Sequence, residues 1–313
     1  MTISFTIINP GFLSLIVDAG RTGMQEQGFS GSGPLDVEAF NFANWLSGNP
    51  EGNPCIEIAG DVHIRFEHSA TIAVCGPAVS LAVNGEPASE LATINLSAGD
   101  DVQISQQLAG QRCYFAVQGA WQIPEIAGSV CTVMREKLGG LAGDGKPLHA
   151  GDTIHVVPAA QENISRILPA SMLAPYASDA PVDIIPAYQH DMFSSRVRAT
   201  FYSSAYSVTP QSDRMGYRLS GPAISSGFEA MRSEGINCGS VQVPADGQPI
   251  IMLADRQTLG GYPKIGVIAP YDLPRVAQSV PGTTLTFNPV DPENARGTWL
   301  LRQARIDNFF RNN

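Results

Sequence analysis

Short strand-like runs, each closed by turn-forming residues, constrain the fold of this chain more than any other feature of its sequence. Each run has four to six residues that alternate between apolar and polar side chains or are largely apolar, as expected for β-strands. Glycine (31 residues) and proline (23 residues) are frequent and follow no regular period, which indicates many turns. We therefore expect a mainly β protein. The expected strands are 3–8, 62–66, 71–75, 79–83, 113–117, 153–157, 182–186, 199–203, 240–244, 249–253 and 284–287.

One turn pattern recurs along the chain and indicates how these strands are joined. A small residue or proline is followed by glycine, a polar residue and an alternating strand. Such a turn is typical of chain reversal at the edge of an antiparallel barrel. We predict two barrel-like β domains, residues 1–160 and 181–313, with the alanine-, serine- and proline-rich stretch 161–180 as their connection. The three copies of the turn lie at 97–105, 149–157 and 280–288.

Helices are predicted to be few and short. The segment 36–47 begins with Asp36 as a candidate N-cap, places apolar residues on one face and stops before Gly48. A second helix is predicted over 272–279, with Asp272 as the cap and a proline in its first turn.

Charge and composition exclude several classes of function. The formal net charge is −10, whereas nucleic-acid binding requires clusters of lysine and arginine. The N-terminus lacks the features of a signal peptide, and no run approaches the roughly 20 apolar residues of a membrane span. Five widely spaced cysteines without a C-x-x-C pair predict free thiols in a reducing compartment. We expect a soluble cytoplasmic protein that binds neither nucleic acid nor membranes.

Two familiar motifs are present only in incomplete form, and a third is missing. The segment 140–147 resembles a phosphate-binding loop, but Pro147 replaces the serine or threonine that would hold magnesium, and no helix is expected after it. The segment 229–234 resembles a biotin-attachment sequence, but Arg232 replaces the lysine that would accept biotin. We therefore expect no covalent biotin. The histidines show no metal-ligand spacing, so we also expect no metal.

Two parts of the chain combine glycines with polar side chains suited to binding. The first is 17–36, where five glycines accompany Asp18 and Arg21. The second consists of 212–222 and 253–266, the latter a dense mixture of charged and polar residues around a Gly-Gly pair. We predict that these segments share one pocket.

The same segments resemble the biotin-dependent carboxyltransferase family, which includes allophanate hydrolase subunit 2, the Kip antagonist proteins and the C component of 5-oxoprolinase. The resemblance extends from about residue 10 to about residue 290. It is carried by DAGR, GSGPLD and EAFNFAN near the start, and by DRMGYRLSGP, VQVPADGQPI and LADRQTLGGYPKIG in the second half.

The resemblance implies a fold of two cyclophilin-like β-barrel domains and a function within a heteromeric complex. For the oxoprolinase branch it implies two further proteins, a smaller Kip inhibitor-like B component and an A component, which together with this chain would hydrolyse 5-oxoproline to glutamate. The complex would use ATP, bound mainly on another of its proteins. One alternative is a component that moves a carboxyl group from carboxybiotin to urea or a related amide. Another is a non-catalytic regulatory binder of the Kip inhibitor-like protein.

Amide or lactam chemistry suggests roles for the residues of these motifs. Lys264 is expected to place a positive charge near the amide oxygen, with Asp255 and Arg214 as further catalytic residues. An arginine can also bind a substrate carboxylate through two hydrogen bonds. The expected substrate-binding residues are Arg21, Asp18, Gln257, Thr258, Gly260, Gly261 and Tyr262.

Structural alternatives exist for several of these assignments. Arg214 or Arg218 could pair with Asp213 or Glu234 on the surface, Tyr262 could be a packing residue, and Asp18 could simply cap its own glycine turn. The middle motif, 128–140, also departs from the family pattern. It has Val130 and Cys131 where the family would have an arginine followed by Ser-Thr, and Arg135 is a candidate substitute.

Overall fold

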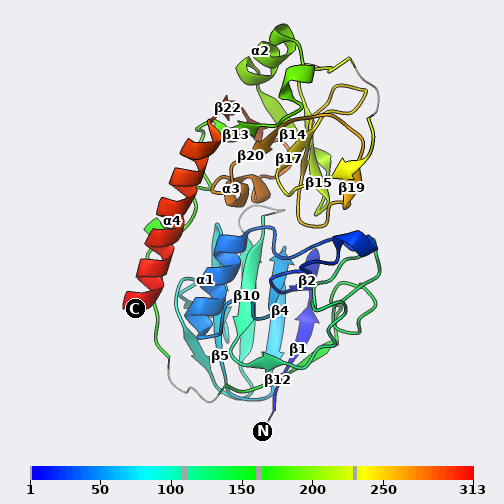
Figure 1. The fold of residues 1–313 in the computed structure, drawn as a ribbon. Coiled ribbons are helices and arrows are strands. Elements are labelled where there is room, and N and C mark those ends of the chain that lie inside the picture. Colours follow the sequence, from blue (N-terminus) through cyan, green and yellow to red (C-terminus); the bar gives the residue numbers. More distant parts are fainter. Residues whose placement is uncertain (1, 107–110, 160–163, 228–230) are drawn as a thin grey trace. The chain divides into compact units, whose positions relative to one another are not determined.

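Contacts divide the chain into two units (Figure 1). The computed structural model describes residues 2–106, 111–159, 164–227 and 231–313. The first unit comprises Met1–Met24 and Ser32–Leu173, and the second comprises Gln25–Gly31 and Ala174–Asn313. The sequence suggested a connection at 161–180; the contacts divide the chain between Leu173 and Ala174 and assign the short loop Gln25–Gly31 to the second unit.

The first unit contains a seven-stranded and a five-stranded sheet. In the larger sheet the strand order is β11-β12-β1-β4-β9-β6-β7, and in the smaller it is β2-β3-β10-β5-β8; all neighbours are antiparallel. The strands of the larger sheet are β1 (Ile3–Asn9), β4 (Val62–Phe66), β6 (Val79–Val83), β7 (Glu86–Ala88), β9 (Asp101–Gln106), β11 (Ala120–Trp121) and β12 (Thr153–Val157). Those of the smaller sheet are β2 (Leu13–Val17), β3 (Cys55–Ala59), β5 (Ala70–Cys75), β8 (Ile94–Leu96) and β10 (Cys113–Val117).

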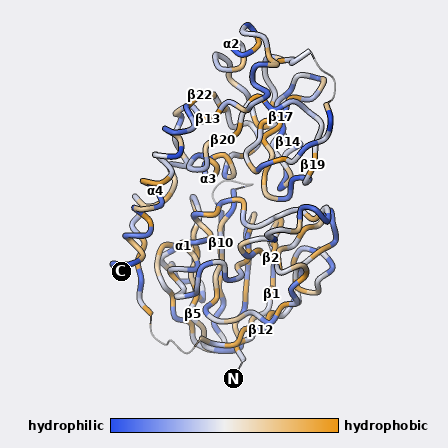
Figure 2. Tube along the Cα trace, viewed as in Figure 1, coloured by the Kyte–Doolittle hydropathy of each residue, from blue (hydrophilic) through white to orange (hydrophobic). Residues whose placement is uncertain are grey.

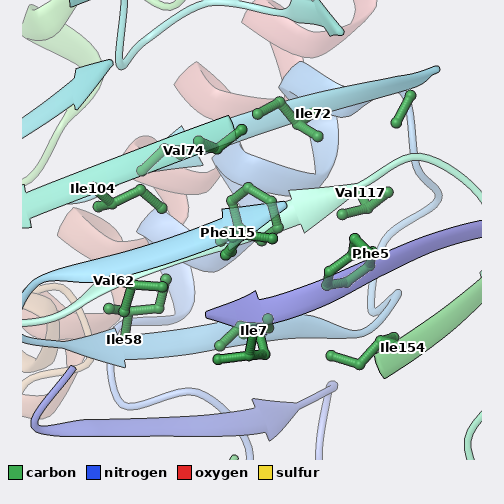
Figure 3. Packing of buried hydrophobic residues seen from close by; sticks show 14 of the residues in the cluster. Phe5, Ile7, Ile58, Val62, Ile72, Val74, Ile104, Phe115, Val117 and Ile154 are labelled. Atoms are coloured by element: carbon green, nitrogen blue, oxygen red, sulfur yellow. The ribbon is translucent and has the colours of Figure 1, made fainter. Parts of the chain in front are cut away.

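One hydrophobic core draws side chains from both of these sheets (Figure 3). Strand β1 alternates, so that Ile3, Phe5 and Ile7 are buried while the residues between them are not. The Phe5 ring stacks on Phe66 at 5.1 Å and meets the edge of Phe115, from the smaller sheet, at 6.1 Å. The core thus explains the alternating runs on which the β prediction depended.

Helix α1 (Val37–Ser47) covers the smaller sheet and confirms the helix predicted there. The Asp36 carboxylate accepts the Ala39 N–H at 3.0 Å, and Gly48 ends the helix with a φ of +73°. The helix packs on β5 and β10, and all five residues of β10 are buried. A strand covered on both faces needs an unbroken apolar run, which is what "CYFAV" provides.

The second unit is built on an eight-stranded sheet of order β21-β14-β15-β18-β17-β20-β13-β22. Its two edge strands, β21 and β22, are separated in the chain by Thr286 alone, so the sheet curls until its edges nearly meet as in a barrel. A separate ladder joins β16 to β19. The strands are β13 (Val182–Pro186), β14 (Tyr206–Ser212), β15 (Gly216–Ser220), β16 (Glu234–Gly235), β17 (Ser240–Gln242), β18 (Ile250–Met252), β19 (Leu259–Gly260), β20 (Lys264–Ile268), β21 (Thr284–Leu285) and β22 (Phe287–Pro289).

The helices of the second unit correct two expectations. The predicted strand 199–203 is wrong: it is the end of α2 (Ser195–Ser203), whose cap Ser194 accepts the Val197 N–H and whose Phe201 packs on Phe287. Helix α3 (Leu273–Ala277) lies within the predicted 272–279, although the Asp272 side chain makes no capping bond.

Helix α4 (Pro292–Asn312) has 21 residues and was not expected, since the sequence suggested only short helices. Polar and apolar residues are interspersed along it (Figure 2). Three short 3₁₀ turns complete the described elements; they are η1 (Gln25–Gln27), η2 (Ala170–Met172) and η3 (His190–Met192). Within the described ranges, no helix is both long and apolar enough to cross a bilayer.

Candidate functional site

Arg214 and Asp255 form a buried, two-pronged ion pair at the start of the glycine-rich turn between β18 and β20. The Arg214 guanidinium donates from Nε to Asp255 Oδ2 at 2.9 Å and from Nη2 to Asp255 Oδ1 at 3.0 Å. The backbones are joined as well, because the Asp255 N–H donates to the Arg214 carbonyl at 2.9 Å. Both side chains are buried. The pair therefore ties the loop before β15 to the turn after β18.

The same turn is braced by two further contacts. The Ser30 hydroxyl, from the short loop that belongs to this unit, donates to the Arg256 carbonyl at 3.0 Å. Arg256 in turn donates from Nε to the Ile236 carbonyl at 2.8 Å. Ser30 lies in the glycine-rich segment 17–36, so this part of that segment contacts the turn 253–266.

Lys264 lies at the start of β20, just after the Gly-Gly pair, and its charged side chain is buried. It is only 6% exposed. Its Nζ forms an ion pair with Glu234, donates to the Gly235 carbonyl at 3.2 Å, and lies 5.6 Å from the centre of the Tyr188 ring. This ammonium is thus held in a fixed position between an acidic side chain and an aromatic face.

Tyr188 and Gln189, which follow β13, converge on the same Glu234 carboxylate. Gln189 donates from Nε2 to Glu234 Oε1 at 2.6 Å, and the Tyr188 hydroxyl donates to Glu234 Oε2. The Lys264 contact and then the Tyr188 hydrogen bond lower the pKa of Glu234 below its ordinary value, so this carboxylate is ionised at neutral pH. The hydrogen bond to Glu234 raises the pKa of Tyr188.

Gly260 and Gly261 are required by close approach rather than by unusual dihedral angles, since neither has a positive φ. A Cβ on Gly260 would lie 2.5 Å from Ile236 Cδ1 and 2.8 Å from Gln242 Nε2. A Cβ on Gly261 would lie 2.8 Å from the carbonyl oxygen of Met231, whose N–H donates to the Gly261 carbonyl. The glycines thus allow the segment around β16 to lie directly over the turn.

Two amide side chains flank Gly260. The Gln257 Nε2 lies 3.3 Å from the position that a Cβ on Gly260 would take, and the Gln242 Nε2 lies 2.8 Å from the same position. Gln242 is buried, and its Nε2 has no hydrogen-bond partner in the described part of the chain. Leaving a buried N–H group unpaired costs about 1–3 kcal/mol of stability, which makes the Gln242 amide a candidate ligand-binding group.

The remaining predicted residues of this turn lie nearer the surface. Tyr262 is 40% exposed, next to the buried Pro263. Thr258 is half-buried and its carbonyl accepts the Ile236 N–H at 3.1 Å. The suggested surface pairing of arginines is wrong for Glu234, which pairs with Lys264, while Arg218 pairs with Asp246.

Asp18 and Arg21 belong to the first unit, where they organise the loop 126–131. The Asp18 carboxylate accepts the Gly20 N–H at 2.8 Å, as in the Asx turn considered from the sequence, and also the Ser129 hydroxyl at 2.6 Å. Arg21 is buried and donates from Nε to the Ile126 carbonyl at 3.1 Å and from Nη2 to the Cys131 carbonyl at 2.8 Å. Both side chains therefore have strong contacts within their own unit.

The departure from the family pattern at Val130 and Cys131 fits this arrangement. The Cys131 thiol lies 3.0 Å from Asp18 Oδ1, and burial, followed by the nearby Asp18 charge, raises its pKa to about 12. Val130 is buried, and its N–H donates to Asp18 Oδ2. Arg135 forms an ion pair with Glu136.

The structure thus brings together Arg214 with Asp255, and Lys264 with Glu234, the ladder partner of Gly260, while Asp18 and Arg21 lie in the other unit. Sequence reasoning missed Tyr188, Gln189 and Gln242, which carry no local motif and meet Lys264 or Gly260 only through the sheet. No group of three or more His, Cys, Asp or Glu side chains suited to a metal ion occurs in the described ranges.

Comparisons with known proteins show which family this chain belongs to. The family described as "Carboxyltransferase domain, subdomain A and B" matches residues 27–289. The C component of the 5-oxoprolinase of Haemophilus influenzae is 32% identical over 298 residues, which cover 95% of this chain and 94% of that protein. The corresponding component of the Escherichia coli 5-oxoprolinase is 30% identical, and the match covers 90% of this chain and 89% of that protein.

Solved structures of much larger enzymes contain the same fold. The urea amidolyase of K. lactis matches with a TM-score of 0.86 at 26% identity, over 98% of this chain. The match covers only 20% of the urea amidolyase chain, so this protein corresponds to about one fifth of that enzyme.

Proposed function

Because the chain belongs to the family of carboxyltransferase domains of subdomain A and B type, we propose that it is the C component of an ATP-dependent 5-oxoprolinase. The observation that carries the proposal is similarity to the C components of two 5-oxoprolinases over nearly the full length of the proteins compared. In the proposed reaction water adds to the ring amide of 5-oxoproline, the C–N bond breaks, and glutamate forms at the expense of ATP.

The proposed complex also contains an A component and a Kip inhibitor-like B component, and it works in the cytoplasm. The chain is proposed to be inactive alone, to carry no covalent biotin and to leave most ATP contacts to another protein of the complex. Two observations support the absence of a phosphate-binding loop here. The loop 140–147 is followed by the strand β12 and not by a helix, and the Gly145 N–H donates to the Gly139 carbonyl.

Lys264 is proposed as the catalytic cation of the site, and its Nζ would stabilise negative charge on the bound substrate. A buried ammonium in a fixed position can stabilise developing negative charge without reorganising at the moment of reaction. Gln257, Thr258 and Tyr262 would contact the substrate around the Gly260–Gly261 pair. Arg214 and Asp255 would act by fixing the turn that carries these residues, since each already satisfies the other.

Asp18 and Arg21 are proposed to shape a second substrate-facing loop in the first unit. Their contacts hold the backbone of 126–131 in place. Loss of either would therefore act on binding through this loop.

Glutamate release from 5-oxoproline and ATP tests the proposal. We expect release only when this chain is combined with both the A and the B components. Lys264→Met should lower kcat about 10²–10³-fold, as for loss of one preorganised electrostatic group. Lys146→Met is the matched control, because Lys146 is an exposed lysine whose partner is Asp144; it should retain full turnover.

A second function keeps some support from the structural likeness to urea amidolyase. If the assembled complex releases no glutamate, the oxoprolinase proposal is overturned. Carboxyl transfer from carboxybiotin to an amide acceptor would then be measured with the same Lys264→Met and Lys146→Met pair.

A further inference from the structure

Resting on the proposed function, we propose that Tyr188, Gln189 and Lys264 form a carboxylate-binding cradle, which the side chain of Glu234 occupies in this structure. The ligand class is a small cyclic amide that carries a carboxylate. Its carboxylate would replace that of Glu234, so that Glu234 acts as a built-in competitor.

The first argument is the donor set. Three side chains of different kinds, an ammonium, an amide and a phenol, all donate to the two oxygens of one carboxylate. Lys264 and Gln189 donate to Oε1, and Tyr188 donates to Oε2. One positive charge with two neutral donors suits a monoanion that has two acceptor oxygens.

The second argument is that contacts independent of Glu234 hold these donors in place. The Gln189 side chain is buried, and its Oε1 accepts the Lys264 backbone N–H at 2.6 Å. Its Nε2 also donates to the Tyr188 hydroxyl at 3.0 Å. Lys264 Nζ keeps its hydrogen bond to the Gly235 carbonyl. The cradle is therefore organised before any ligand binds, which reduces the entropic cost of binding.

The third argument concerns the occupant. The Glu234 side chain is 32% exposed, whereas that of Lys264 is 8% exposed, so Glu234 can return to water more cheaply. Glu234 also lies in β16, a strand of only two residues. Its lowered pKa keeps it ionised, so the occupant has the same charge as the proposed ligand. Tyr188 is 75% exposed, so one wall of the cradle faces solvent.

The fourth argument identifies the rest of the ligand. Gln242 is the register partner of Lys264 across β17 and β20, beside an irregularity in that ladder. Its Nε2 lies 2.8 Å from the position of a Cβ on Gly260, which is the ladder partner of Glu234. The buried Gln242 Nε2 has no partner in the described part of the chain. A lactam carbonyl oxygen is the acceptor that this donor lacks, and a ring that bears both a carboxylate and a lactam would use both features.

Binding of 5-oxoproline to this chain alone, measured by calorimetry, tests the proposal. Glu234→Ala removes the competitor and should tighten binding about tenfold, given an occupancy of roughly nine-tenths by Glu234. Glu234→Gln keeps the shape but loses the charge and should also bind more tightly. Tyr188→Phe, which removes one donor, should weaken binding. Asp246→Ala is the matched control, because it removes the carboxylate of another ion pair of the same unit, with Arg218; its affinity should equal that of the unaltered chain.

A second ligand separates the carboxylate from the ring. The affinity for 2-pyrrolidinone, the same lactam without a carboxylate, should not respond to Glu234→Ala. The proposal is overturned if the folded Glu234→Ala and Glu234→Gln variants bind 5-oxoproline no more tightly than the unaltered chain, or if none of these proteins binds it. Since this measurement needs neither the A nor the B component, its result is independent of glutamate release by the complex. Competition by Glu234 without glutamate release would support the cradle and overturn only the oxoprolinase.

Discussion

At the scale of single residues, the second unit contains both a buried ion pair and a partly exposed one, and we expect the two to contribute very differently to stability. Arg214 and Asp255 are buried and joined by two hydrogen bonds, whereas Arg218 and Asp246 are partly exposed. Removing one partner of a buried ion pair leaves an uncompensated charge that water hydrates poorly. When one partner of an exposed ion pair is removed, water solvates the remaining charge.

Substitution of these aspartates should give very different losses of stability. We expect Asp255→Asn to lower the free energy of unfolding of the second unit by about 3–5 kcal/mol. Asp246→Asn should cost about 0–1 kcal/mol. Urea unfolding followed by far-ultraviolet circular dichroism measures both. Equal, small losses would show that the buried pair does not hold the turn.

At the scale of secondary-structure elements, helix α4 depends on its first turn. The Asp291 carboxylate accepts the Glu293 N–H at 2.9 Å and the Asn294 N–H at 3.4 Å, and Pro292 occupies the first helical position. Few of its residues are buried, so the cap matters more than in a helix embedded in a core.

Loss of this cap should therefore loosen the helix. Asp291→Ala should cost about 1 kcal/mol and speed amide hydrogen exchange in the first two turns of α4. Asp307→Ala, an exposed aspartate within the same helix, should leave exchange in those turns unchanged. Slow exchange in both variants would place the stability of α4 in its packing instead.

The elements also show where sequence reasoning works. Helix α1 was predictable because Asp36 and Gly48 mark both of its ends. Strand 199–203 was a wrong prediction because five residues are too few to distinguish periods of 2 and 3.6, and the Ser194 cap lies outside them. The start of α4 was signalled by Asp291 and Pro292, but its polar sequence hid the rest.

The candidate site was predictable only in part. The turn 253–266 is conspicuous through its glycines and charges, which are local features of the sequence. The partners of Lys264 are not local: Tyr188 and Glu234 lie far away in the chain, and the pairing of β13 with β20 and of β16 with β19 gathers them. Sheet register decides such contacts, and no short motif specifies it.

At the scale of the whole molecule, the cysteines report separately on the two units. Cys55, Cys75, Cys113 and Cys131 are buried in the first unit, and Cys238, which is half-buried, belongs to the second. Burial raises the pKa of all five thiols, that of Cys113 and Cys131 to about 12, but only the four thiols of the first unit are fully buried. Thiols react as thiolates, so these four are inert while the first unit is folded.

Labelling with a disulfide reagent at pH 8 should reflect this distribution. We expect Cys238 to react first and the other four to react only as fast as the first unit opens, with all five reacting in denaturant. In a Cys238→Ser variant the fast phase should disappear. A fast phase of several thiols in the native protein would contradict the burial described for the first unit.

The assignment of Gln25–Gly31 to the second unit has a consequence for biosynthesis. The ribosome makes these residues early, yet their partners at Asp255 and Arg256 emerge only near the end of translation. At ordinary elongation rates the delay is on the order of tens of seconds. The nascent first unit must therefore fold while this loop still lacks its hydrogen-bond partners. In a prematurely terminated chain the loop would never gain them and would stay exposed to proteases.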